Sequence, residues 1–228
     1  RASLRLSIAQ SATLRNLERG LQPPQSGHDN PHYFSDDAMV RSVALALTQP
    51  PDAVATTVRQ DAVISNAEDG VWAAEAYAVA LSAVLHGATA AHAVSEAVAV
   101  IPTDSWLHDD VERARTTARE ARGHLARITA LHDETWLPAY DYGTAAPMAL
   151  ARTLAIVEAL DGDYLACMAT ALALPRTSAS VTPLTAALCA AMGTGPPDDG
   201  TSLRLAGHAL PHLEGVDVLD RYETLQQP

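Results

Sequence analysis

Alanine-rich apolar segments recur along the chain, and each of them ends at glycine, proline or a cluster of polar residues. About a fifth of the 228 residues are alanine and only 4% are aromatic, a mixture that favours closely packed helices over β-sheet surfaces. No segment shows the sustained alternation of polar and apolar residues that is typical of strands. The sequence therefore predicts an all-α protein, and its length and apolar content predict a single compact helical domain over residues 1–228.

The positions of the helices follow from the helical period of the apolar residues and from the capping and breaking residues between them. The long segment after residue 104 is amphipathic, and its arginine- and glutamate-rich face, which includes Arg115, is expected to lie in solvent. His108, Asp109 and Asp110 lie in its first turn and are also expected to be solvated. The predicted helices cover residues 2–20, 35–47, 52–63, 71–85, 91–100, 104–131, 145–160, 164–172 and 181–192, with loops at 21–31, 132–144 and 193–200 and a loosely helical tail.

The net charge limits the kinds of partner to be expected, and the cysteines indicate the cellular compartment. The net charge of −12 and the pI of about 5.0 argue against nucleic acid as a partner, because a phosphate-backbone binder needs a basic face. All 15 basic residues are arginine, which together with the abundant alanine suggests a GC-rich bacterial genome.

Cys167 and Cys189 lie in apolar segments and are expected to be buried free thiols in a reducing cytoplasm. No signal peptide appears at the start, and charged and histidine residues interrupt the most apolar stretch, 71–100, so a cytoplasmic protein without a membrane helix is expected.

The most distinctive polar cluster is Ser35-Asp36-Asp37, at the predicted start of a helix and shortly after a loop. One interpretation is a helix cap, in which Ser35 is the N-cap and the two aspartates complement the helix dipole. The other is a magnesium site, because Mg²⁺ binds proteins through one or two carboxylates together with water. From the motif alone the cap is favoured, since caps of this kind are common.

A loop rich in aromatic residues is a second candidate for ligand contact. Tyr142 and Gly143 lie in it, and an aromatic side chain on a loop can stack on a base or a sugar. Packing underneath the loop is an equally open interpretation for Tyr142. His32 lies close to the aspartate pair in the sequence and can join the same site.

Three stretches of the chain resemble the ADP-ribosylglycohydrolase family, which includes the dinitrogenase-reductase activating glycohydrolases. Residues 32–47 (HYFSDDAMVRSVALAL) resemble the family's Thr-Asp-Asp-Thr helix and the apolar run after it. Residues 69–81 (DGVWAAEAYAVAL) resemble the helix after its His-x-Asp-Pro turn, and residues 142–150 (YGTAAPMAL), with the segments up to 192, resemble its C-terminal half. The resemblance implies an all-α fold, hydrolysis of ADP-ribose from a protein side chain or small-molecule acceptor, and two Mg²⁺ ions that hold the ribose and activate water.

The same resemblance implies where the metal ligands should lie. In the family they are an aspartate in the first helix, the Thr-Asp-Asp and a late Asp-Thr-Asp motif. Residues 35–37 match the Thr-Asp-Asp, with serine in place of threonine. Ser11 stands at the first-helix position, and Thr177 and Ala179 stand at the two late aspartate positions. Only two carboxylates therefore remain to offset the dehydration cost of divalent ions.

Three functions fit these residues. In the preferred hypothesis the chain keeps the family's fold, has lost most of the dinuclear site, and binds or transforms a small ligand in the interhelical cleft. Asp36 or Asp37 would then act as general acid or base, with Ser35, His32 and Tyr142 as helpers, as in an enzyme of bacterial specialised metabolism. The alternatives are an active Mg²⁺-dependent ADP-ribosyl hydrolase with a single-metal site, and a non-catalytic binding module. No cofactor is expected apart from Mg²⁺ held weakly by the two aspartates, and an alanine-rich face can support an oligomer.

Overall fold

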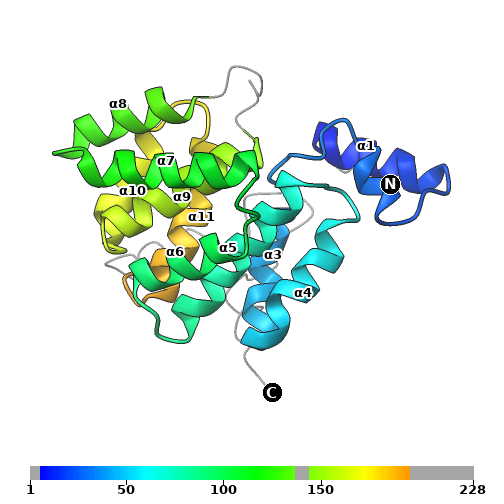
Figure 1. Cartoon of the computed structure of the whole chain (residues 1–228), viewed down its shortest axis with the longest axis horizontal. Helices are drawn as coiled ribbons and strands as arrows, with labels where there is room; N and C mark the ends of the chain where they lie inside the picture. The colour runs from blue at the N-terminus through cyan, green and yellow to red at the C-terminus, as the bar shows by residue number, and fades with distance from the viewer. Residues whose placement is uncertain (1–5, 137–143, 196–228) are drawn as a thin grey trace, which may run out of the picture. The chain divides into compact units, whose positions relative to one another are not determined.

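The computed structural model describes residues 6–136 and 144–195. Within these residues the chain forms helices and no strand, so the all-α prediction is confirmed (Figure 1). The prediction of one domain over residues 1–228 extends beyond the described part of the chain and stays a prediction, as does the helical tail. The helices are α1 (Ile8–Glu18), α2 (Gln25–His28), α3 (Asp37–Thr48), α4 (Pro51–Ala62), α5 (Asp69–Leu85), α6 (Ala90–Ala99), α7 (Trp106–Glu120), α8 (His124–Thr135), α9 (Ala146–Ala159), α10 (Tyr164–Ala173) and α11 (Ser178–Ala191).

Helices α5 and α9 form the centre of the core. Both are buried over almost their whole length, as expected for helices that are apolar on all sides. Helices α3, α4 and α6 pack against α5, α7 lies along α9, and α11 contacts both central helices (Figure 1). Many of the buried side chains are alanine, and small side chains at a contact reduce the distance between helix axes.

The prediction of one helix over residues 104–131 is wrong, because the segment forms two helices. Helix α7 ends at Glu120, the next residue, Ala121, is extended, and Gly123 has a φ of 96°. This positive φ suits glycine, and it redirects the chain into α8, which packs beside α7. Residues 132–135, which were predicted to be loop, belong to α8. The loop predicted over residues 21–31 contains the short helix α2.

Two predictions of exposure on α7 are also wrong. The Arg115 side chain is only 12% exposed, because its guanidinium binds the Glu158 carboxylate of α9 at 2.7 and 2.8 Å and also contacts Glu112. Asp110 is buried and pairs with Arg113. Burial raises the pKa of Asp110 to about 6, against the opposing effect of the Arg113 charge. The amphipathic pattern predicted exposure for both residues. Arg115 is buried by its pairing with Glu158 on another helix, and Asp110 is buried by the packing around it.

Other features agree with the expectations. Both cysteines are free and buried. Among the residues that the structure describes, no helix combines the length and the apolar character needed to cross a bilayer.

Candidate functional site

A short backbone pairing brings the N-termini of α3 and α9 together. The Asp36 N–H donates to the Thr144 carbonyl at 2.8 Å, and the Ala146 N–H donates to the Phe34 carbonyl at 2.8 Å. Ser35 and Ala145 lie opposite each other between these bonds as an isolated antiparallel bridge. The two helix starts, more than a hundred residues apart in the sequence, therefore form one edge of the site.

The buried side chain of Asn66 holds the segment before α3 in place through hydrogen bonds to its backbone. Its amide nitrogen donates to the Tyr33 carbonyl at 2.9 Å and to the Ser35 carbonyl at 2.7 Å. The first turn of α5 packs tightly against the same segment. A Cβ atom added at Gly70 would lie 2.2 Å from the Tyr33 carbonyl oxygen. Asn66 is buried, so losing these bonds would take away the side-chain donor of the Ser35 carbonyl and leave the Tyr33 carbonyl with the Ala67 N–H at 3.3 Å.

The Asp37 carboxylate is held by three neutral donors. The hydroxyls of Ser7 and Ser35 donate to one oxygen at 2.9 and 3.1 Å, and the Gln10 amide donates to the other at 3.1 Å. Ser7 and Gln10 also form the capping box of α1, so the start of that helix presents both donors to Asp37. The predicted N-cap role of Ser35 is wrong, because α3 begins at Asp37 and its N-cap is Asp36, which makes no side-chain cap bond.

Asp36 has a different environment from its neighbour. The residue is 5% exposed, and within residues 6–136 and 144–195 one oxygen of its carboxylate has no hydrogen-bond partner. Burial and, to a lesser extent, the nearby Asp37 charge together raise the pKa of Asp36 to about 6, against hydrogen bonds from Ser180 and from its own backbone, which lower it. A buried carboxyl group that titrates near neutrality is suited to proton transfer.

A pocket of about 230 Å³ opens beside Ser35 and Asp37, and Asp36, which lies between them in the sequence, is not among its lining residues. The structure thus brings together three of the predicted site residues, His32, Ser35 and Asp37, on the wall of one cavity. Tyr142 and Gly143 lie outside the described residues. The full lining consists of Ser7, Ile8, Ala9, His32, Phe34, Ser35, Asp37 and Thr144.

Arg152, which the sequence analysis did not single out, is the largest fully buried side chain. It is 0% exposed, and its guanidinium donates to the Thr135 hydroxyl at 2.7 Å, the Thr177 hydroxyl at 2.6 Å and the Pro175 carbonyl at 3.2 Å. The remaining amino group has no hydrogen-bond partner in the described part of the chain, and burial lowers the pKa of Arg152 to about 10. The available signal was one arginine in the apolar run 145–160.

The residues present do not fit a dinuclear magnesium centre. Two Mg²⁺ ions need several anionic oxygen ligands, and the side chains that bond to Asp36 and Asp37 are neutral serines and a glutamine, with the neutral-or-cationic His32 on the same pocket wall. The described ranges contain no group of three or more histidine, cysteine, aspartate or glutamate side chains placed to hold a metal ion. Asp36 and Asp37 are the residues that could bind a single ion.

The sequence profile of the family described as ADP-ribosylglycohydrolase matches residues 2–195. No curated protein and no solved structure gives a significant match. The matched range includes all eleven of the helices described above.

Proposed function

The chain belongs to the ADP-ribosylglycohydrolase family, and on this basis we propose that it is a divergent member that works without two-metal chemistry. It binds a small ligand in the pocket beside Ser35 and Asp37, and Asp36 serves as the proton-transferring group. Since folds host many chemistries, the proposal rests on the site and not on family membership alone.

The contact between Arg152 and Thr177 carries this proposal. The resemblance places Thr177 where the family has a metal-ligating aspartate, and here its hydroxyl accepts a 2.6 Å hydrogen bond from a buried guanidinium. A fixed positive charge in a region of low dielectric repels a divalent cation. At this position the chain therefore has no anionic metal ligand, and the positive charge of Arg152 lies next to it.

The bonding of Asp37 supports the same conclusion. A carboxylate offers about four lone-pair positions, and three of them already accept bonds from Ser7, Gln10 and Ser35. These donors hold Asp37 in a fixed orientation toward the pocket. Asp37 is therefore suited to accept a hydrogen bond from a ligand hydroxyl.

Asp36 is the group suited to move a proton, since it is buried, carries an unpartnered oxygen and has a pKa raised to about 6. In its ionised form it can take up a proton and in its protonated form it can release one, although only its neighbours Ser35 and Asp37 line the pocket itself.

The experiment is calorimetric titration of ADP-ribose into the protein, once with Mg²⁺ and once with EDTA. The family makes ADP-ribose the first probe, and we expect any binding to be equal in the two buffers and weaker in Asp37→Asn. Glu120→Gln, an exposed carboxylate at the end of α7, is the matched control and should bind as the wild type does.

Two outcomes would change the assignment. Binding or ADP-ribose release that requires Mg²⁺ and is lost in Asp37→Asn would contradict the proposal and support the Mg²⁺-dependent hydrolase. Absence of binding in both buffers would remove ADP-ribose as the ligand and direct the search to other small molecules.

A further inference from the structure

Helix α10 contains no charged residue, yet one of its faces lies in solvent. Leu165 and Leu172 are each 62% exposed, and Ala169 between them is exposed as well. These three residues recur at i, i+4 and i+7, so they form one stripe along the helix, on the side opposite the buried Cys167. Because a helix that is apolar on nearly all sides is ordinarily buried on all of them, the stripe indicates a surface that another protein covers.

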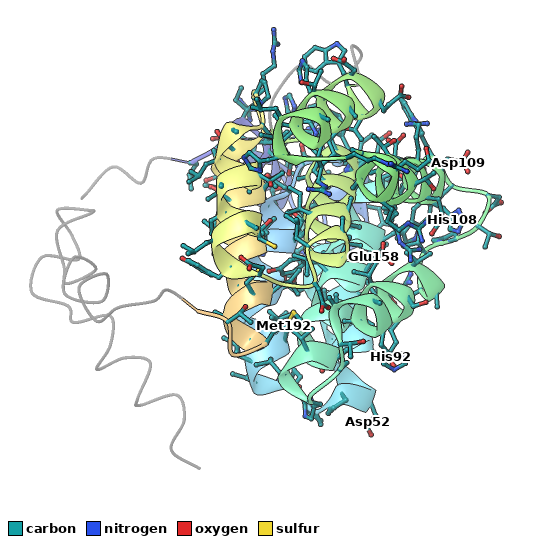
Figure 2. All side chains as sticks on the ribbon, turned by 90° about the vertical axis from the view of Figure 1, so that its left-hand side faces the viewer. Asp52, His92, His108, Asp109, Glu158 and Met192 are labelled. Atoms are coloured by element: carbon teal, nitrogen blue, oxygen red, sulfur yellow. The ribbon has the colours of Figure 1, made fainter. Side chains whose placement is uncertain are left out.

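The helix beside α10 is uncharged too. Helix α11 packs against α10, carries no charged side chain, and exposes Ala179, Pro183 and Ala190. Helices α8 and α10 lie on the left of Figure 1, and Figure 2 turns that side toward the viewer. The whole chain has a net charge of −12, so two copies repel each other on average. An uncharged face is therefore where a second copy can approach with the least repulsion.

The residues along α10 are arranged symmetrically about its middle. Leu165 and Leu172 lie at equal distances in the sequence from the midpoint between residues 168 and 169. Asp161, before the helix, and Arg176, after it, are both exposed and are equally distant from the same midpoint. A two-fold axis through that midpoint brings Leu165 of one copy to Leu172 of the other, and it brings opposite charges together at both ends. A partner other than a second copy would not require this symmetry.

The charges at the two ends of α10 are held in ordered positions. The Arg176 guanidinium stacks over the Trp136 ring, 4.5 Å from its centroid, and keeps its positive charge there. At the other end Asp163 is the N-cap of α10, and its carboxylate accepts a hydrogen bond from the Ala166 N–H at 2.9 Å. Side chains that are already ordered lose less conformational entropy when an interface forms.

We propose that two copies of the chain associate through antiparallel α10 helices related by a two-fold axis. The leucine side chains lie at the centre of this interface, and Asp161 of each copy lies near the partner's Arg176 at its rim. The apolar centre supplies most of the affinity, because exposed ion pairs contribute little. The charge pairs at the rim select the antiparallel direction.

The test is sedimentation velocity of the full chain at about 1 to 100 μM, where we expect a concentration-dependent dimer. Leu172→Asp should weaken dimerisation at least about thirtyfold, because the two-fold axis places the new carboxylate in the centre of the interface twice. Leu14→Asp, at an exposed leucine of α1, is the matched control and should dimerise as the wild type does.

Charge reversal tests the antiparallel direction. Arg176→Asp and Asp161→Arg should each weaken dimerisation about two- to tenfold at low salt, because each places like charges together at both ends of the interface. The double variant restores opposite charges across the interface, so it should dimerise within about twofold of the wild type.

All the substituted side chains are exposed, so each variant should keep the helical circular dichroism spectrum of the wild type. The proposal is overturned if the chain stays monomeric at about 100 μM, if Leu172→Asp dimerises as well as the wild type, or if the double charge reversal dimerises no better than the single ones. A monomer would assign the exposed face of α10 to a different protein or to residues outside the described ranges.

Discussion

The two adjacent aspartates of the site should respond in opposite directions to the same substitution. Asp36→Asn replaces a buried carboxyl group that is costly to ionise, whereas Asp37→Asn replaces a carboxylate that accepts three hydrogen bonds. Both changes conserve shape, so the difference between them reports on the environment of each charge.

For Asp36 the magnitude follows from its titration. The difference between the ordinary pKa of 3.8 and the native value of about 6 corresponds to about 3 kcal/mol. Because the native state binds this proton more tightly than the unfolded chain does, stability is favoured below about pH 4 and falls as the pH rises to about 6. Asp36→Asn removes that loss, so it should raise the free energy of unfolding by up to about 3 kcal/mol at pH 7.5 and by little at pH 4.

For Asp37 the sign is reversed. Asparagine keeps one acceptor oxygen and places an NH₂ group against donors from Ser7, Gln10 or Ser35. Leaving such donors unpaired should lower the free energy of unfolding by about 1–3 kcal/mol at neutral pH.

The assay is urea unfolding followed by circular dichroism, in EDTA, at about pH 7.5 and about pH 4. The reasoning is refuted if Asp36→Asn destabilises the protein at neutral pH, or if its gain is the same at both pH values. It is also refuted if the two variants shift stability in the same direction at neutral pH.

Three further substitutions, each followed by urea unfolding, test the contacts that hold the segment before α3 in place and one helix cap. Asn66→Ala leaves the Tyr33 and Ser35 carbonyls without their side-chain donor, so we expect a loss of about 2–3 kcal/mol together with weaker ligand binding at the pocket. Gly70→Ala puts a methyl group 2.2 Å from the Tyr33 carbonyl oxygen and should cost more than about 2 kcal/mol; a loss within a few tenths would contradict the packing. Ser105→Ala removes the N-cap bond of α7 and should cost about 1 kcal/mol, with no change in binding as its control.

Much of the fold could be predicted because its signals are local. Apolar residues at helical period, and glycine or proline between the segments, locate most of the helices. The break between α7 and α8 was missed because the charged amphipathic pattern continues across Gly123 without interruption. The burial of Arg115 was missed because its partner, Glu158, lies 43 residues away on another helix.

The site was predictable only in part for the same reason. The Ser-Asp-Asp cluster is contiguous, so a sequence pattern can reveal it. Its supporting residues, among them Gln10 and Asn66, acquire their roles only when distant segments meet. Arg152 differs, because the one arginine of an apolar helix is visible in the sequence, although its hydrogen-bond partners are not.

The pairing of residues 34–36 with residues 144–146 has a consequence for how this scaffold can evolve. Its hydrogen bonds join main-chain atoms, so they persist whichever side chains occupy those positions. Substitutions can therefore exchange the reactive groups of the pocket while the two helix starts remain in register. On such a scaffold a change of metal ligands and a change of chemistry can be separate events, and neither requires the protein to pass through an unfolded ancestor.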